Sequence, residues 1–256
     1  MLKAFLRLFF IALASLIWLV LVVLSLRFLA GQPQYAPADH PLLGRPNWQI
    51  LDLLKSNPST LPPSKDLILL ARLYLSREGQ WVVSTQSYLP TTFQPLNSLS
   101  NEELKAAGIS SLASWVEQHR DFYFLFQIED SAAQALDQIS ELVAKFDLKE
   151  RVLITSRYSS VLTKMREREP LWLYGASTSE ISRLRFLSAI YLEPIVSLQS
   201  DFLILDRWPN ERMRNEIKRR HKKFIFQISS EKIDAELIQK TDGILAQTVE
   251  QLSLED

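Results

Sequence analysis

Short apolar runs alternate with longer amphipathic stretches from about residue 66 to the end of the chain. The runs have the length and the β-branched and aromatic content of buried strands, and the stretches between them repeat apolar residues at a helical spacing. The predicted strands span 67–75, 81–83, 122–128, 152–155, 171–173, 202–205, 224–228 and 244–245. The predicted helices span 101–107, 113–119, 132–146, 159–168, 180–188, 211–220 and 232–240.

This alternation of strand and helix predicts an α/β fold in which parallel strands are joined by crossover helices. Two architectures fit it: an open, doubly wound sheet and a closed (β/α)8 barrel, the TIM barrel. The number of units, seven or eight, favours the TIM barrel. Ser100 with Glu103, and Ser177 with Glu180, have the spacing of capping boxes that open helices.

The N-terminal segment has a different pattern, because residues 8–26 form 19 consecutive uncharged positions. A helix of that length spans about 28 Å, close to the hydrocarbon core of a bilayer. Lys3 and Arg7 precede the run and Arg27 follows it. The excess of positive charge before the run predicts a cytoplasmic N-terminus and an extracytoplasmic C-terminal domain, periplasmic if the cell is bacterial. A cleaved signal peptide is the alternative, but its apolar region is usually only about 7–15 residues long. We therefore expect a single-pass transmembrane helix that holds the protein in the membrane.

A proline-rich segment follows, since seven of the twelve prolines lie between Pro33 and Pro63. Such a composition is typical of an extended spacer, and the apolar spacing at 48–54 predicts a short helix inside it. The predicted organisation is an anchor in 1–30, a linker in 31–62 and a barrel domain in 63–256. A start near residue 38 is the alternative for the first strand region.

Composition excludes several classes of function. The 256 residues carry 29 basic and 29 acidic side chains, so the basic excess of a nucleic-acid-binding protein is absent. There is no cysteine, which excludes disulfides, iron–sulfur sites and thiol catalysis. The six glycines are too widely spaced for a loop that cradles phosphates. The sequence predicts no cofactor and does not indicate an oligomeric state.

Three segments carry a more specific signal. Residues 73–89 combine a strand, the turn Ser76-Arg77-Glu78-Gly79 and a Val-Val strand; residues 126–129 read Phe-Gln-Ile-Glu; residues 241–245 read Thr-Asp-Gly-Ile-Leu. In this order they resemble motifs of the glycerophosphodiester phosphodiesterase family. The similarity extends in scattered form from about residue 40 to 252, and it implies a (β/α)8 barrel.

The resemblance also implies a divalent metal held by carboxylates and two histidines that act as acid and base. Leu70 and Arg72 stand at the position of the family's metal-binding Glu-x-Asp pair. Gln127 replaces the glutamate of its Glu-Ile-Lys strand, and Glu129 replaces the lysine. Because neutral and cationic side chains cannot replace the hard oxygen ligands of Ca²⁺ or Mg²⁺, we expect no metal site and loss of the family reaction.

The acid–base positions are also altered. Thr85 and Gln86 replace the His-Asp pair after the Val-Val strand, and His40 is the one candidate for the catalytic histidine of the first strand motif. The resemblance places Arg72, Thr85, Gln86, Gln127 and Glu129 at the barrel mouth, where they would bind a phosphate-containing or lipid-derived ligand. The alternative for Arg72 is a structural salt bridge to Glu78, Glu129 or another acidic residue.

Three hypotheses follow. The first is a membrane-anchored, degenerate member of these barrels that acts as a binding or scaffolding module. The second is an active phosphoric diester hydrolase with a rearranged site built on His40, Glu129 and Arg72. The third is an unrelated envelope protein that binds a partner. The basic residues between 212 and 223 are expected to be a solvated helix face and not a lipid-binding patch.

Overall fold

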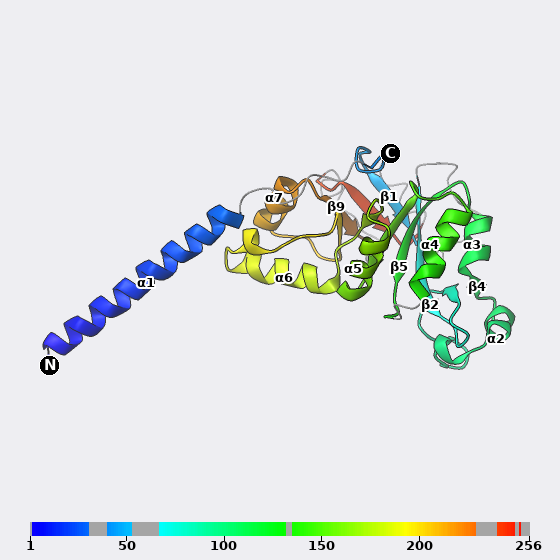
Figure 1. Ribbon diagram of the computed structural model, residues 1–256, viewed down its shortest axis with the longest axis horizontal. Coiled ribbons are helices and arrows are strands. Elements are labelled where there is room, and N and C mark those ends of the chain that lie inside the picture. Colours follow the sequence, from blue (N-terminus) through cyan, green and yellow to red (C-terminus); the bar gives the residue numbers. More distant parts are fainter. Residues whose placement is uncertain are drawn as a thin grey trace.

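The computed structural model describes residues 2–30, 40–52, 67–131, 135–228, 240–248 and 251. Eight parallel strands form a nearly closed barrel, in the order β7-β6-β5-β2-β1-β10-β9-β8 (Figure 1). The gap between the two outer strands is bridged by a parallel contact between Gly175 and Phe202. The strands are β1 (Trp48–Leu51), β2 (Ile68–Leu75), β5 (Tyr123–Ile128), β6 (Val152–Ser156), β7 (Leu173–Tyr174), β8 (Phe202–Leu205), β9 (Lys223–Gln227) and β10 (Gly243–Ala246).

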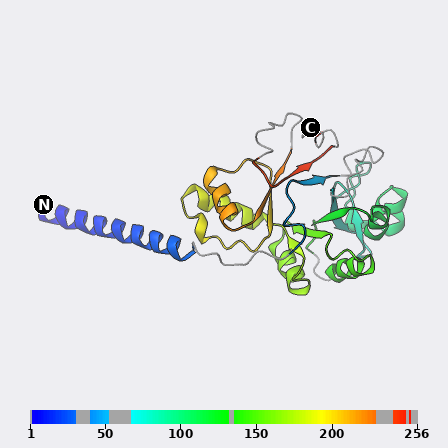
Figure 2. The same ribbon diagram turned by 90° about the horizontal axis from the view of Figure 1, so that it is seen from above.

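Helices cover the outside of this barrel (Figures 1 and 2). They are α3 (Leu112–Gln118), α4 (Leu136–Lys145), α5 (Ser159–Arg168), α6 (Thr178–Ala189) and α7 (Glu211–Arg219), with a 3-10 turn, η5 (Glu193–Ile195), between α6 and β8. Each long helix buries one face; in α7, for example, Met213, Glu216 and Ile217 are buried. Parallel strands with helices on the outer surface are the architecture of a TIM barrel.

The chain makes one excursion from this regular pattern, between β2 and β5. Strand β3 (Trp81–Val83) pairs antiparallel with β2, and β4 (Ser110–Ser111) pairs antiparallel with β3. The excursion also contains η3 (Leu96–Ser98) and α2 (Asn101–Ala106). Helix α2 begins at Ser100, whose side chain accepts a hydrogen bond from the Glu103 amide while the Glu103 carboxylate accepts one from the Ser100 amide. The predicted capping box at this position is therefore confirmed.

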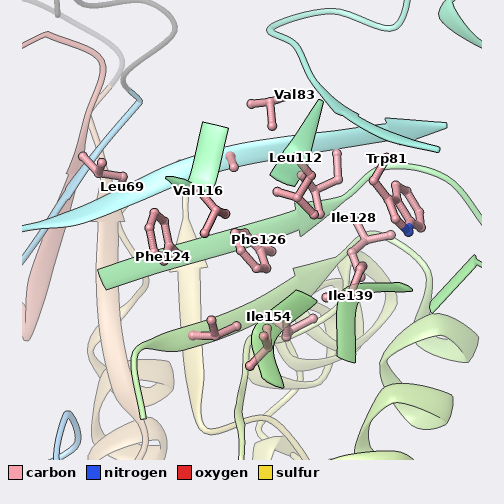
Figure 3. Packing of buried hydrophobic residues seen from close by; sticks show 14 of the residues in the cluster. Leu69, Trp81, Val83, Leu112, Val116, Phe124, Phe126, Ile128, Ile139 and Ile154 are labelled. Atoms are coloured by element: carbon pink, nitrogen blue, oxygen red, sulfur yellow. The ribbon is translucent and has the colours of Figure 1, made fainter. Parts of the chain in front are cut away.

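The alternation of side chains along each strand separates two hydrophobic layers. On β2, Ile68 and Leu70 face the barrel interior, where a compact cluster also contains Trp48, Leu125 and Phe202. The opposite face of the sheet packs on the helices, and Figure 3 shows this larger layer. Its labelled members are Leu69, Trp81, Val83, Leu112, Val116, Phe124, Phe126, Ile128, Ile139 and Ile154.

Gly243 is required by the close approach of β10 to β1. A Cβ atom at this position would lie 2.6 Å from both the Cβ and the carbonyl oxygen of Trp48. Since real side chains do not approach that closely, only glycine fits without a shift of the strand.

A loop closes the barrel at the N-terminal ends of its strands. Leu42 is buried in the interior cluster, and its carbonyl accepts a hydrogen bond from the Trp48 indole. The Arg45 guanidinium lies over the ring of Tyr123 at the start of β5, and the Arg45 carbonyl accepts a hydrogen bond from Lys223 at the start of β9. The loop 40–45 therefore forms the base of the barrel, opposite the mouth.

Helix α1 (Leu2–Ala30) projects away from the barrel beside α6 and α7 (Figures 1 and 2). It contacts η5. Among the residues that the structure describes, no helix is both long and apolar enough to be a membrane span.

One prediction of secondary structure is wrong. The segment predicted as a short helix within the linker contains strand β1, which pairs with β2 and β10, so the barrel takes its first strand from inside 31–62. The segment 81–83 is a strand, as predicted, but it pairs antiparallel and so is not one of the barrel strands. The other predicted strands are confirmed within two residues at each end. The predicted helix 232–240 lies almost entirely outside the described residues.

Candidate functional site

A hollow of about 590 Å³ opens at the C-terminal ends of the strands. In TIM barrels the residues at this end of the strands and in the loops that follow form the ligand site. Its floor is apolar and its walls are polar. The lining residues are Leu70, Arg72, Gln127, Glu129, Thr155, Ser156, Arg157, Tyr158, Ala176, Thr178, Ile181, Ile204, Gln227 and Leu245.

Arg72 is held at this mouth by three elements. It lies on β2 opposite Gln127 of β5, with its side chain on the interior face. Its Nη2 lies 2.7 Å from Oδ2 of Asp52, and its Nη1 donates a hydrogen bond of 3.2 Å to the Thr85 carbonyl. The Asp52 carboxylate is fully buried, whereas the Arg72 side chain keeps 17% exposure. A buried carboxylate needs such a charged partner, so the alternative interpretation of Arg72 as a salt-bridge residue is confirmed, with Asp52 as the acid.

Glu129 forms the second ion pair of the mouth. Its carboxylate lies 2.6 Å from Nη2 of Arg157 and accepts a hydrogen bond from the Gln127 side-chain amide. The Glu129 side chain is almost fully buried, while 59% of Arg157 is exposed. Arg157 is therefore the cation of the mouth that a ligand reaches most easily.

The phenol of Tyr74 interacts with the charges of Glu129, Arg72 and Arg157. Burial raises its pKa, and the Glu129 carboxylate adds to this effect, while Arg72 and Arg157 oppose it. Tyr74 is therefore neutral at ordinary pH and supplies no further anion.

The mouth does not fit the divalent cation that the family resemblance implies. Arg72 stands where a carboxylate ligand would be needed, and both nearby carboxylates are already engaged by guanidinium groups. Within the described part of the chain, no three His, Cys, Asp or Glu side chains gather in a way that could hold a metal. A cation would have to displace Arg157 or Arg72 to obtain a single charged ligand, which is too few for Ca²⁺ or Mg²⁺.

The structure brings together three of the predicted site residues, Arg72, Gln127 and Glu129. Thr85 takes part through its backbone carbonyl, and the exposed Gln86 does not line the hollow. His40 lies at the base of the barrel, where its ring accepts a hydrogen bond from the Leu42 amide. The structure therefore does not bring His40 together with Arg72 and Glu129, as the rearranged hydrolase site would require.

Asp52 and Arg157 were not among the site residues predicted from the sequence. Asp52 directly follows β1, and Arg157 directly follows β6. The signal that could have found them is a charged residue directly after a predicted parallel strand, because the positions that follow the strands form the mouth. The mistaken helix at 48–54 concealed the first of them.

Ser156 is also at the mouth, but it is not an available nucleophile. Its hydroxyl donates a 2.7 Å hydrogen bond to the Ile128 carbonyl and accepts one from the Tyr158 amide. The hydroxyl thus holds the loop after β6 in place, and among the described residues of the mouth no histidine or free carboxylate lies beside it as a base.

Comparison with known proteins places the fold. No protein-family model matches the chain, and no curated protein matches it in sequence. Several solved structures, however, match it in fold. A protein from Galdieria sulphuraria assigned as a glycerophosphodiester phosphodiesterase superimposes with a TM-score of 0.61 at 12% identity, covering 80% of this chain and 95% of its own.

Two further structures agree. The phosphodiesterase domain of an uncharacterised Mycobacterium tuberculosis protein gives a TM-score of 0.58 at 10% identity, covering 79% of this chain and 96% of its own. The glycerophosphodiester phosphodiesterase of Agrobacterium tumefaciens gives 0.56 at 10% identity, covering 78% and 96%. At this level of identity the likeness concerns the fold, and the sequence resemblance is confirmed to that extent: this chain has the barrel fold of the glycerophosphodiester phosphodiesterases.

Proposed function

We propose that this protein is a non-catalytic binding protein, built on the barrel of a phosphodiesterase and held at a membrane by its N-terminal helix. The observation that carries the proposal is the ion pair between Arg72 and the fully buried Asp52. A guanidinium at this point both replaces a metal ligand and repels a cation. Hydrolysis of a phosphodiester by the metal-dependent route needs that cation to neutralise the phosphate and to activate the attacking group.

The proposed ligand carries a phosphate group, whether it is free in solution or derived from a lipid. Arg157 offers an exposed guanidinium at the rim, and Gln127, Gln227 and Thr178 offer neutral hydrogen-bonding groups around it. Guanidinium groups suit phosphate oxygens because they donate two parallel hydrogen bonds. The apolar floor at Leu70 and Leu245 would contact a glycerol or another carbon skeleton.

The test uses glycerol 3-phosphate and glycerophosphocholine as probes with the full chain in detergent micelles. Calorimetry is expected to detect binding in the presence of a metal chelator, with no release of product after long incubation. Arg157→Ala is expected to weaken binding about tenfold or more, since a hydrogen bond to a charged group contributes about 1.5–3 kcal/mol. Arg168→Ala is the matched control, because that arginine pairs with Asp137 outside the mouth.

Turnover would contradict the proposal. If either probe were hydrolysed in a reaction that needs Ca²⁺ or Mg²⁺, and if Arg72→Ala or Glu129→Ala abolished it, the protein would be an enzyme. Tight stoichiometric binding of a divalent ion at the mouth would overturn the same proposal without any assay of activity.

The membrane anchor and the extracytoplasmic location of the barrel are proposed from the sequence. The uncharged run 8–26 supports them, as do its exposed apolar side chains, such as Phe10, Trp18 and Leu21. The protein is expected to sediment with membranes and to resist extraction by high salt. A variant with Leu16→Asp and Val20→Asp is expected to lose this behaviour, because each central aspartate opposes insertion by about 2.5–3.5 kcal/mol. Extraction of the unaltered chain by salt alone would exclude the anchor.

A further inference from the structure

Exposed apolar side chains are concentrated in one short segment of the barrel. Outside α1, seven large apolar side chains of the described residues are exposed, and four of them fall between residues 186 and 195. Phe186 is 67% exposed, Tyr191 53%, Ile190 48% and Ile195 37%. Phe186 and Ile190 are four positions apart at the end of α6 and therefore project from the same side of the helix. Single exposed apolar residues need no explanation, but four within ten residues do.

This segment lies where α1 meets the barrel. Helix α1 contacts η5, and both views show the C-terminal end of α1 beside the ends of α6 and α7 (Figures 1 and 2). The segment runs along α7 on the side of the barrel. Ser188 and Tyr191 contact Asn210 and Arg212, which follow the C-terminal end of β8. At the other end of α7, Arg220 donates hydrogen bonds to the carbonyls of Glu193 and Pro194. A bilayer that contains α1 would consequently lie next to these four side chains.

Arg212 lies next to this segment and is of a residue type that is common at membrane interfaces. The Arg212 guanidinium lies 3.5 Å from the centre of the Tyr191 ring, and Arg212 is itself exposed. Aromatic rings are favoured at the level of the lipid headgroups, and arginine is attracted by anionic headgroups by about 1 kcal/mol per residue. A single side of the barrel thus presents apolar, aromatic and cationic groups together.

We propose that the membrane-facing segment, Phe186, Ile190, Tyr191, Ile195 and Arg212, rests in the headgroup region of the bilayer beside α1. This inference depends on the proposed membrane anchor. It orients the barrel, because the side that carries α7 then faces the bilayer.

The absence of cysteine allows a direct test, because a single introduced cysteine is the one site of thiol labelling. Ile190→Cys and Phe93→Cys are each labelled with an environment-sensitive fluorophore in the full chain. Phe93 is the matched control, because it is apolar and 75% exposed and belongs to the excursion before α2. Helix α2 lies at the opposite end of the molecule from α1 (Figure 1). Both proteins are reconstituted into vesicles of phosphatidylcholine with a minor share of phosphatidylglycerol, and circular dichroism confirms that both are folded.

The label at position 190 is expected to show a blue-shifted emission that rises severalfold on reconstitution and is quenched by lipids with a nitroxide near the headgroup. The label at position 93 should keep the emission that it has in water. Introducing Arg212→Glu should reduce the shift at 190, and more so in vesicles with more phosphatidylglycerol.

Two results would overturn the proposal in distinguishable ways. If the protein floats with the vesicles while the emission at 190 stays that of an aqueous label, the anchor stands and the membrane-facing segment does not. If the protein fails to float, the anchor itself is excluded. A blue shift at 190 that appears in micelles and grows with protein concentration would instead assign the segment to contact with a second copy of the chain.

Discussion

Ionisable groups at the two ends of the barrel lie in opposite environments: they form short ion pairs at the mouth and are forced towards their neutral forms at the base. At the mouth, Asp52 and Glu129 lie within 2.7 Å of guanidinium nitrogens, beside an open hollow. At the base, Asp201 and Lys222 are 3.9 Å apart. Burial raises the pKa of Asp201 and lowers the pKa of Lys222, so each is pushed towards its neutral form.

The difference shows what each end is built for. Short ion pairs keep the charges of the mouth in place where water and ligands enter, whereas the base is closed by Leu42 and Trp48 and tolerates charge poorly. The mouth is thus a polar binding surface whose charges are already balanced, and the base is a structural seal. Four variants test this contrast, and they are given in order of decreasing effect on stability.

Asp52→Ala should have the largest effect. It leaves the guanidinium of Arg72 largely buried without its carboxylate partner, which typically destabilises a protein by about 3–5 kcal/mol. Urea unfolding in detergent micelles measures the change. The double variant Asp52→Leu with Arg72→Leu is the control, and it should recover most of the loss because no unpaired charge remains. If the double variant were as unstable as the single one, the lost packing and not the unpaired charge would be responsible.

Gly243→Ala tests the seal at the base. The new Cβ would collide with the Trp48 backbone, so we expect a loss of about 1–3 kcal/mol, typical of an overpacked interior. Gly44→Ala is the matched control in the adjacent loop, because the nearest atom to its Cβ lies at 3.8 Å. Its effect on thermal unfolding should be within about 0.5 kcal/mol. Equal stability of the two variants would mean that β1 and β10 are free to move apart.

His40→Asn examines the same end through pH. Burial lowers the pKa of His40 below its usual 6.5, while Glu150 and Asp201 oppose that shift. The unfolded chain then takes up a proton at a pH where the folded chain does not, so stability falls as the pH decreases through 6.5 towards the folded pKa. Asparagine keeps an acceptor for the Leu42 amide but does not titrate. The variant should therefore lose less stability than the unaltered protein between pH 7.5 and 5.5, and an unchanged slope would show that other groups cause it.

Arg157→Ala should have the smallest effect on stability. More than half of this side chain is exposed, so water can replace its guanidinium, and the Gln127 amide still donates a hydrogen bond to the Glu129 carboxylate. The loss should therefore be about 0–1 kcal/mol. Thermal unfolding should hardly change, although binding of glycerol 3-phosphate should weaken. A loss of several kcal/mol would show that Arg157 seals the mouth as Asp52 does, and the contrast between binding and structural charges would fail.

Part of the site could not be predicted because the strand that carries it is too short to show a clear period. Residues 48–52, Trp-Gln-Ile-Leu-Asp, have too few positions to separate a strand period from a helical one, and prolines flank them. Their pairing with residues 243–246, at the other end of the sequence, is what makes them a strand. The segment 81–83 was recognised as a strand, but only its antiparallel partners exclude it from the barrel.

A second local motif was changed by distant contacts. Ser177 caps α6 as predicted, and its hydroxyl accepts a hydrogen bond from the Glu180 amide. The Glu180 carboxylate does not return to Ser177. It accepts hydrogen bonds from the backbone amides of Gln199 and Ser200, and so fastens the loop before β8. Burial of this carboxylate made the distant amides the better partners.

Local patterns in the sequence account for most of the elements and for part of the chemistry of the mouth. The period of apolar residues placed the helices and most strands, the capping box placed the start of α2, and the substitutions at Leu70, Arg72 and Gln127 indicated a mouth without metal ligands. The fold brings together the groups that are far apart in the chain: Asp52 pairs with Arg72, His40 lies at the base, and η5 contacts α1. The physical reason is that periodicity and capping act within a few residues, whereas ion pairs and barrel closure join atoms far apart in the chain.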